Sequence, residues 1–259
     1  MIDLSFSLSD LEYFLLIMVR VTVFVYAAPF FGMINTPNRF KIGLGMMISI
    51  LIYYGMPRGA VEYSTVFGFA VLVIKEAVTG LLIGLSASIC TSILGFAGHL
   101  VDMETGLSMA TLFDMMNRDS LTLTGMFYQY VVLLMLMITG MYQYVLSALV
   151  SSFSLIPVSG AIFASDKLYA AILTFLVEYI SIGFRISLPV FAAIMLLDAI
   201  LGILTKVSPQ LNMFAVGIQL KVLTGLGVLF LTVAMLPRAS AIILDEMRRM
   251  VENFIGAMT

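Results

Sequence analysis

The chain contains long apolar stretches, and the longest of them, from Ser120 to Ser165, holds no Asp, Glu, Lys, Arg or His. One vertical crossing of a bilayer needs only about 20 apolar residues. Composition points the same way, because 61% of the 259 residues are hydrophobic and 11% are charged, whereas soluble domains average roughly 45–50% and 25%. Backbone polar groups inside a bilayer must be paired, which favours helices. The sequence therefore predicts an all-α integral membrane protein.

Six apolar stretches predict about six long, kinked hydrophobic helices that form hairpins in a single membrane domain, residues 1–259. The stretches are Leu11–Ile34, Phe40–Met56, Val66–Leu100, Thr124–Leu155, Leu168–Leu204 and Met213–Leu236. Two regions exceed the length of one crossing, so we expect a hairpin or re-entrant element within 120–165 and a bend near Gly183 or Pro189. Residues 239–259 predict a short amphipathic helix at the surface.

The sequence lacks the motifs that mark enzymes and cofactor sites. His99 is the only histidine and Cys90 the only cysteine, and there is neither a glycine-rich phosphate loop nor a metal-spaced set of His and Cys. The net charge of −2 includes no basic patch of the kind that binds nucleic acid. We therefore expect no catalysis, no cofactor, no metal and no nucleic-acid partner.

Several ionisable residues lie in apolar surroundings, where each is costly: Arg20, Lys75 with Glu76, Glu178, Arg185 and Asp198. Glu178 and Arg185 are seven positions apart and share a helix face, so they could pair with each other or with neighbouring subunits. We interpret the set as structural or inter-subunit, and ion conduction is the alternative.

Small residues recur every four positions at Gly80, Gly84, Ser88 and Ser92. Such a ridge lets helix backbones approach closely. Packing within the chain and packing against another subunit explain it equally well.

The positions of the positive charges do not give a consistent prediction of how the chain is oriented in the membrane. Arg39 and Lys41 follow the first stretch, whereas Arg238, Arg248 and Arg249 follow the last, so six crossings would place the two clusters on opposite sides. We expect Arg39 and Lys41 on the cytoplasmic side.

The segment from Asp198 to Lys221 interrupts two apolar runs. Pro209 cannot donate a backbone hydrogen bond, and Gln210 and Asn212 lie beside the groups that it frees. Non-helical backbone at membrane depth survives only where protein or water covers it. The segment is therefore interpreted as a buried, partner-facing hinge, with a short cytoplasmic turn as the alternative.

Methionines gather in the region from Gly98 to Asp119, at Met103, Met109, Met115 and Met116 around Phe113. Methionine is unbranched and can repack around changing shapes, as a deformable seal requires. Gly106 would allow a sharp turn. Chance clustering is the alternative in a chain with 20 Met residues. These features leave two classes, a subunit of a multi-protein membrane channel or a small secondary transporter.

Across nearly its whole length the sequence resembles the family of flagellar biosynthetic proteins FliR and their counterparts in virulence type III secretion systems. The residues that carry the resemblance are Arg20, Pro29, Pro37, Arg39 and Lys41, then Asp102, Gly106, Leu107, Ser108, Ala110 and Asp114, then Gly140, Ser152, Phe153 and Pro157, and finally Pro189, Asp198, Gly202, Pro209, Gln210, Asn212, Phe214, Gly217 and Lys221. The sequence departs from the family pattern at Met115, Met141 and Gln219.

The resemblance implies a core subunit of the flagellar type III protein export gate, in the bacterial inner membrane at the flagellar basal body. Its partners would be FliP and FliQ, with FlhB and FlhA, the lipid membrane and unfolded flagellar export substrates. The fold would resemble a fusion of a FliP-like part, about 1–165, and a FliQ-like part, about 166–259. The alternatives are the virulence counterpart and a small secondary transporter.

The resemblance also implies a pore plug near residues 106–117, with Gly106, Met109, Phe113, Met115 and Met116 as the sealing residues. Residue pattern and resemblance together assign assembly or structural roles to a wider set. This set is Arg20, Pro37, Arg39, Gly80, Gly84, Glu178, Arg185, Asp198, Pro209, Gln210, Asn212 and Lys221.

Overall fold

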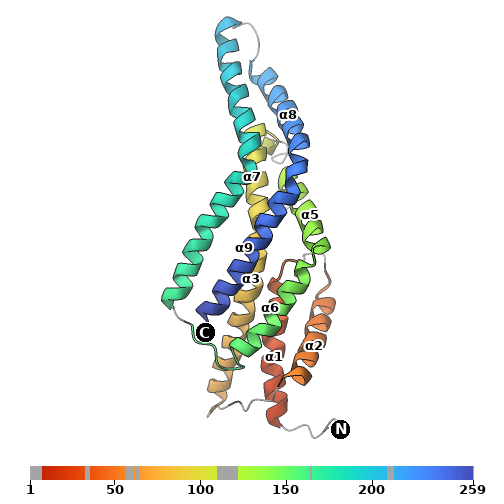
Figure 1. Cartoon of the computed structure of the whole chain (residues 1–259), viewed down its shortest axis with the longest axis vertical. Coiled ribbons are helices and arrows are strands. Elements are labelled where there is room, and N and C mark those ends of the chain that lie inside the picture. Colours follow the sequence, from red (N-terminus) through yellow and green to blue (C-terminus); the bar gives the residue numbers. More distant parts are fainter. Residues whose placement is uncertain are drawn as a thin grey trace. The chain divides into compact units, whose positions relative to one another are not determined.

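The computed structural model describes residues 8–32, 36–56, 61, 63, 65–109, 122–163, 165–208 and 213–258. Every regular element in these ranges is helical, which confirms the all-α prediction (Figure 1). In chain order the helices are α1 (Leu8–Ala27), α2 (Asn38–Gly55), α3 (Val66–Thr105), α5 (Leu123–Ile138), α6 (Met141–Leu155), α7 (Ser165–Val207), α8 (Met213–Thr232), the 3-10 turn η1 (Val233–Met235) and α9 (Leu236–Ala257).

Each of the six apolar stretches contains a helix, and the stretch from Thr124 to Leu155 is divided between two. Helices α5 and α6 are separated by a break at Thr139 and Gly140, where Gly140 has φ +73°. Side chains disfavour that left-handed conformation and glycine does not. Helix α7 is one continuous helix that contains both Gly183 and Pro189, the two positions at which the sequence predicts a bend.

Three helical stretches are long and apolar enough to cross a membrane: Val66–Thr105, Ser165–Val207 and Val216–Ala257. The broken α5–α6 pair could supply a fourth. Among the described residues this is fewer than the six stretches of the sequence. The reason is local charge, since α1 carries Asp10, Glu12 and Arg20 and α2 carries Arg39 and Lys41 in its first turn.

The chain divides into two compact units. Unit 1 comprises residues 1–90, 140–175 and 245–259, and unit 2 comprises 91–139 and 176–244. Three of the boundaries fall inside α3, α7 and α9, and the fourth falls at the break between α5 and α6.

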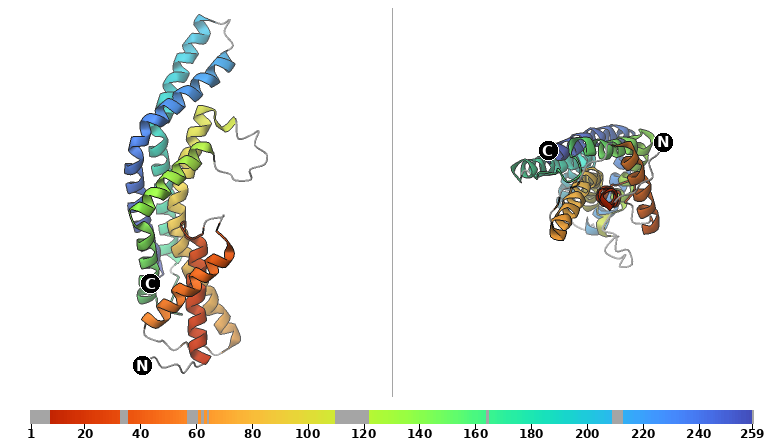
Figure 2. Two further views of the ribbon diagram at one scale, coloured as in Figure 1. Left: turned by 90° about the vertical axis from the view of Figure 1, so that its right-hand side faces the viewer. Right: turned by 90° about the horizontal axis from the view of Figure 1, so that it is seen from below.

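Unit 1 is built around α1, which lies beside α2 (Figures 1 and 2). One face of α1 is buried with helical spacing, at Tyr13, Leu16, Ile17, Arg20, Val21, Phe24 and Val25. The C-terminal part of α9 buries Met247, Met250, Val251 and Phe254. The predicted amphipathic tail is therefore a helix whose apolar face is buried in protein.

Unit 2 has a small core at Val101, Val190 and Ile194, which come from α3 and α7. Leu197 of α7 and Val228 and Leu229 of α8 pack against that core. The C-terminal half of α7 and helix α8 lie side by side in both views (Figures 1 and 2).

The two glycines of the small-residue ridge on α3 pack against α1 within unit 1. A Cβ atom at Gly80 would lie 2.2 Å from the carbonyl oxygen of Arg20, and one at Gly84 would lie 2.6 Å from the Cβ of Ala27. Both distances are far inside van der Waals contact. Helices α1 and α3 can therefore touch backbone to backbone only because these positions have no side chain.

We expect Gly80→Ala to lower the free energy of unfolding by about 1–3 kcal/mol, because the new methyl group overpacks the α1–α3 contact. Gly43→Ala is the matched control, since a Cβ atom at Gly43 on α2 meets nothing within 4 Å. That change should leave stability unchanged or raise it by about 0.5–1 kcal/mol. Thermal melting of the two detergent-solubilised variants measures the difference, and equal melting temperatures would show that the contact is not tight.

Candidate functional site

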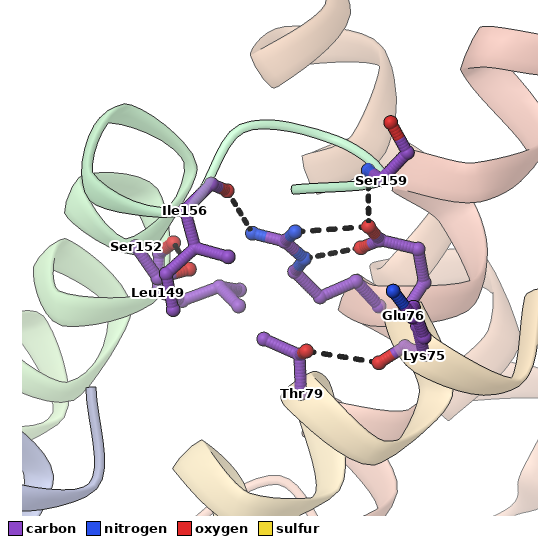
Figure 3. A network of polar contacts seen from close by, with 8 residues as sticks. Lys75, Glu76, Thr79, Leu149, Ser152, Ile156 and Ser159 are labelled. Atoms are coloured by element: carbon purple, nitrogen blue, oxygen red, sulfur yellow. Dashed lines mark hydrogen bonds and ion pairs between the residues drawn. The ribbon is translucent and has the colours of Figure 1, made fainter. Parts of the chain in front are cut away.

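The most buried charges of unit 1 are Arg20 on α1 and Glu76 on α3, both with 0% exposed side chain (Figure 3). The guanidinium of Arg20 donates through Nε to Glu76 Oε2 at 2.5 Å and through Nη2 to Glu76 Oε1 at 3.0 Å. This two-bonded geometry is the strongest pairing available to arginine and a carboxylate. The structure thus joins two residues that lie 56 positions apart.

Both members of the pair also hold the connection between α6 and α7. Arg20 Nη1 donates to the carbonyl of Ile156 at 3.0 Å, and Glu76 Oε1 accepts from the backbone N–H of Ser159 at 2.9 Å (Figure 3). Ser159 has φ +72°, a left-handed conformation that side chains disfavour. The pair therefore fastens α1, α3 and this connection at one point.

The environment of Arg20 satisfies the charge in other ways too. Its guanidinium carbon lies 4.2 Å from the ring centroid of Phe153, which allows a cation–π contact. Among the described residues, every buried side-chain nitrogen or oxygen has a hydrogen-bond partner. Complete pairing is the condition under which buried charge is tolerated.

In unit 2, a buried aspartate ties the C-terminal end of α3 to the start of α5. Asp102, which is 0% exposed, accepts from the backbone N–H of Thr124 at 2.9 Å and from the Thr124 hydroxyl. The hydroxyl of Thr122 caps the same helix by accepting from Gly125 N. A carboxylate at a helix N-terminus is favourable because it pairs with free backbone donors.

Glycines bring the two helices together beside this aspartate. A Cβ atom at Gly98 would lie 2.2 Å from the backbone nitrogen of Gly125. Beyond Asp102, α3 ends at Gly106, whose φ of +82° turns the chain. The described residues on both sides of 110–121 are therefore held close to each other by buried polar and backbone contacts.

An ion pair in unit 2 joins α7 and α8. Lys221 Nζ lies 2.8 Å from the carboxylate of Asp198, and the side chains are 27% and 38% exposed. Both residues were assigned assembly or structural roles from the sequence, and the structure brings them together as partners.

Other residues singled out in the sequence lie apart from these contacts. Glu178 is half-buried and Arg185 exposed on α7, and no ion pair between them occurs in the described part of the chain. Pro37 precedes α2, and Arg39 is exposed in its first turn. Met109 follows Gly106 and is 54% exposed. Phe113, Met115, Met116, Pro209, Gln210 and Asn212 lie outside the described residues.

The sequence identified most of the buried charged residues but not the residues with which they pair. Glu76 was noted as a buried charge but not as the partner of Arg20, and Asp102 was noted only through the resemblance. Lys41 was expected only to mark the cytoplasmic side. The structure shows that it is buried, donates to the carbonyl of Gly32 at 3.1 Å, and lies 5.3 Å from the ring centroid of Tyr26.

The arrangement of these buried charges is suited to holding helices in fixed positions. Within the parts of the chain that the structure describes, no group of three or more His, Cys, Asp or Glu side chains could hold a metal ion. The buried charges are paired and face backbone groups, so they hold helix ends and connections in place.

Comparison with known proteins identifies relatives over most of the chain. The family described as bacterial export proteins, family 1, matches residues 11–247. The flagellar biosynthetic protein FliR of Bacillus subtilis (strain 168) is 30% identical over 212 residues, which cover 81% of each chain. The protein of the same name from Pectobacterium carotovorum subsp. carotovorum is 27% identical over 85% of this chain and 83% of its own. The protein of the same name from Escherichia coli (strain K12) is 24% identical over 82% of this chain and 80% of its own. The resemblance inferred from sequence motifs is confirmed.

We expect Asp102→Ala to cost about 1–3 kcal/mol in the free energy of unfolding, because it leaves the N–H and hydroxyl of Thr124 without their buried acceptor. Glu104→Ala is the matched control, since Glu104 is half-buried on the same helix and its carboxylate pairs with none of the described residues. The free energies of unfolding of both variants are measured in mixed micelles, with helicity as the signal. Equal losses for the two variants would contradict a specific role for Asp102.

Proposed function

The chain belongs to the bacterial export proteins, family 1, and from that premise we propose that it is a core subunit of a flagellar type III protein export gate. The observation that carries the proposal is the match to proteins named FliR over about four fifths of both chains. It is a membrane component of a flagellar export apparatus. Its long apolar helices fit that setting.

The finer proposal concerns partners and place. The chain would assemble with FliP and FliQ, beside FlhB and FlhA, in the bacterial inner membrane at the flagellar basal body. The ion pair of Asp198 and Lys221 supports a protein cover over α7 and α8, because partly exposed charges are expensive in direct contact with lipid. Unfolded flagellar proteins would be the substrates that pass the assembled gate.

The segment near 106–117 would act as the plug of this gate. Support comes from its composition, with Met109, Phe113, Met115 and Met116, and from the buried contact of Asp102 with Thr124 that flanks it. A dewetted apolar constriction blocks hydrated ions, and flexible methionines can part for a polypeptide. Pro209, Gln210 and Asn212 would shape a partner-facing hinge that serves assembly.

Two other functions were considered. A virulence secretion counterpart shares the same family resemblance, but the relatives reported above are all flagellar proteins by name. A secondary transporter would be expected to show repeated halves with matching interrupted helices, which the sequence lacks. Neither alternative has a specific observation in its favour.

Deletion of the gene in its host tests the proposed function. We expect loss of swimming and loss of flagellin from the culture medium, with both restored by the intact gene, because a missing gate subunit stops export of every filament component. Persistent flagellin export in the deletion strain would contradict the flagellar assignment. Loss of a different secretion process would favour the virulence counterpart, and loss of solute uptake the transporter.

A second prediction concerns the plug. Replacing Met109, Phe113, Met115 and Met116 by aspartate should let ions leak through the resting gate, because charged side chains hydrate the constriction. Ion flux into vesicles that carry the assembled complex measures the leak.

Met103→Asp is the control for this experiment. Met103 is 58% exposed on α3, against 54% for Met109, but it lies before the segment assigned to the plug. Vesicles with the Met103 variant should stay tight. A complex with all four plug substitutions that also stays tight would remove the plug assignment.

A further inference from the structure

A groove of about 430 Å³ runs between α6 and α9 of unit 1 and plays no part in the buried contacts described above. Its α6 wall carries Tyr144, Ser147, Ser151 and Leu155, which follow one another with helical spacing. At 1.5 Å per residue, the distance along α6 from Tyr144 to Leu155 is about 16 Å. The groove is therefore long enough to hold an extended chain.

One end of the groove is polar. The hydroxyl of Tyr144 donates to Glu252 Oε1 at 3.1 Å, and the guanidinium carbon of Arg248 lies 5.3 Å from the Tyr144 ring centroid. Arg248 is exposed and makes no ion pair with a described residue. A carboxylate with a remaining acceptor oxygen therefore lines this end, and a cation with N–H donors lies next to it against the ring of Tyr144.

The other end of the groove is apolar. Leu155 on α6 and Ile255 on α9 line it. A Cβ atom at Gly256 would meet nothing within 4 Å, so this glycine leaves the space between the helices open. The walls thus change from charged to apolar along the length of the groove.

We propose that this groove binds a zwitterionic phospholipid with a primary ammonium in its headgroup, of the phosphoethanolamine class. The phosphate accepts from Arg248, the ammonium donates to Glu252, and an acyl chain lies along the groove toward Leu155. Basic side chains beside membrane helices contact lipid phosphates, and Arg248 is an exposed basic side chain of α9.

The paired charges select the headgroup. A phosphoglycerol headgroup would place the same phosphate on Arg248 but would bring only neutral hydroxyl groups to Glu252, so it would form no ion pair there. A phosphocholine headgroup has a positive charge but no N–H group to donate. The site is therefore complementary to a headgroup that carries an anion and a hydrogen-bonding cation together.

Native mass spectrometry of the intact chain, purified in detergent, tests the proposal with the three lipid classes at equal acyl chains. We expect the phosphoethanolamine lipid to be retained several-fold more than either of the others. Arg248→Gln and Glu252→Gln should each remove that preference. Arg249→Gln is the matched control, because Arg249 is exposed on the same helix, whereas the guanidinium beside the Tyr144 ring belongs to Arg248.

Gly256→Leu provides a second test that leaves both charges in place. Its side chain would enter the open groove, so lipid retention should fall while helicity and melting temperature hold. Equal retention of the three lipids, or retention unchanged by Gly256→Leu, would overturn the proposal. So would a Gly256→Leu chain that binds lipid normally but no longer enters the assembled complex, since the groove would then receive a helix of another protein.

Discussion

The ion pair of Arg20 and Glu76 is the contact on which the arrangement of unit 1 depends. Two charges with no exposed surface lose their hydration entirely, and several kcal/mol per ion must be recovered from paired geometry and hydrogen bonds. The pair meets this condition through the two-bonded fork, the carbonyl of Ile156, the N–H of Ser159 and the ring of Phe153. Any slippage of α1 along α3 would break several of these contacts at once.

Polar contacts have special value in so apolar a chain. Burial of hydrophobic surface is non-directional, so it distinguishes poorly between one helix contact and another. A buried charge accepts only the arrangement that satisfies it. In unit 2, Asp102 of α3 fixes the start of α5, and the pair of Asp198 and Lys221 joins α7 to α8. These contacts fix helix positions as Arg20 and Glu76 do in unit 1. Glycines at 80 and 98 permit the close helix approaches beside two of these contacts.

The helices could be predicted from the sequence, because long apolar stretches leave few other ways to pair the backbone. The costly charges could also be recognised, since Arg20 and Asp198 stand out in apolar surroundings. Their partners could not, because 56 positions separate Arg20 from Glu76 and no local pattern joins them. The contacts of Lys41 could not be predicted for a related reason, because the carbonyl and the aromatic ring that bury it are brought to it by the fold.

The number of membrane crossings also could not be predicted from the sequence pattern. Apolar length predicts helix, but α1 and α2 combine apolar length with charges, and this lowers their suitability for lipid. The small-residue ridge of α3 left two explanations open. Only the position of α1 shows that Gly80 and Gly84 serve packing within the chain.

The most direct test of the account is a double-mutant cycle on the free energy of unfolding with Arg20→Met and Glu76→Leu, measured by helicity in mixed micelles. Each single substitution should cost about 3–5 kcal/mol, because it strands the opposite charge in the interior. The double variant should cost little more than either single one. Additive losses would contradict the claim, since they would mean that the two side chains stabilise the fold independently.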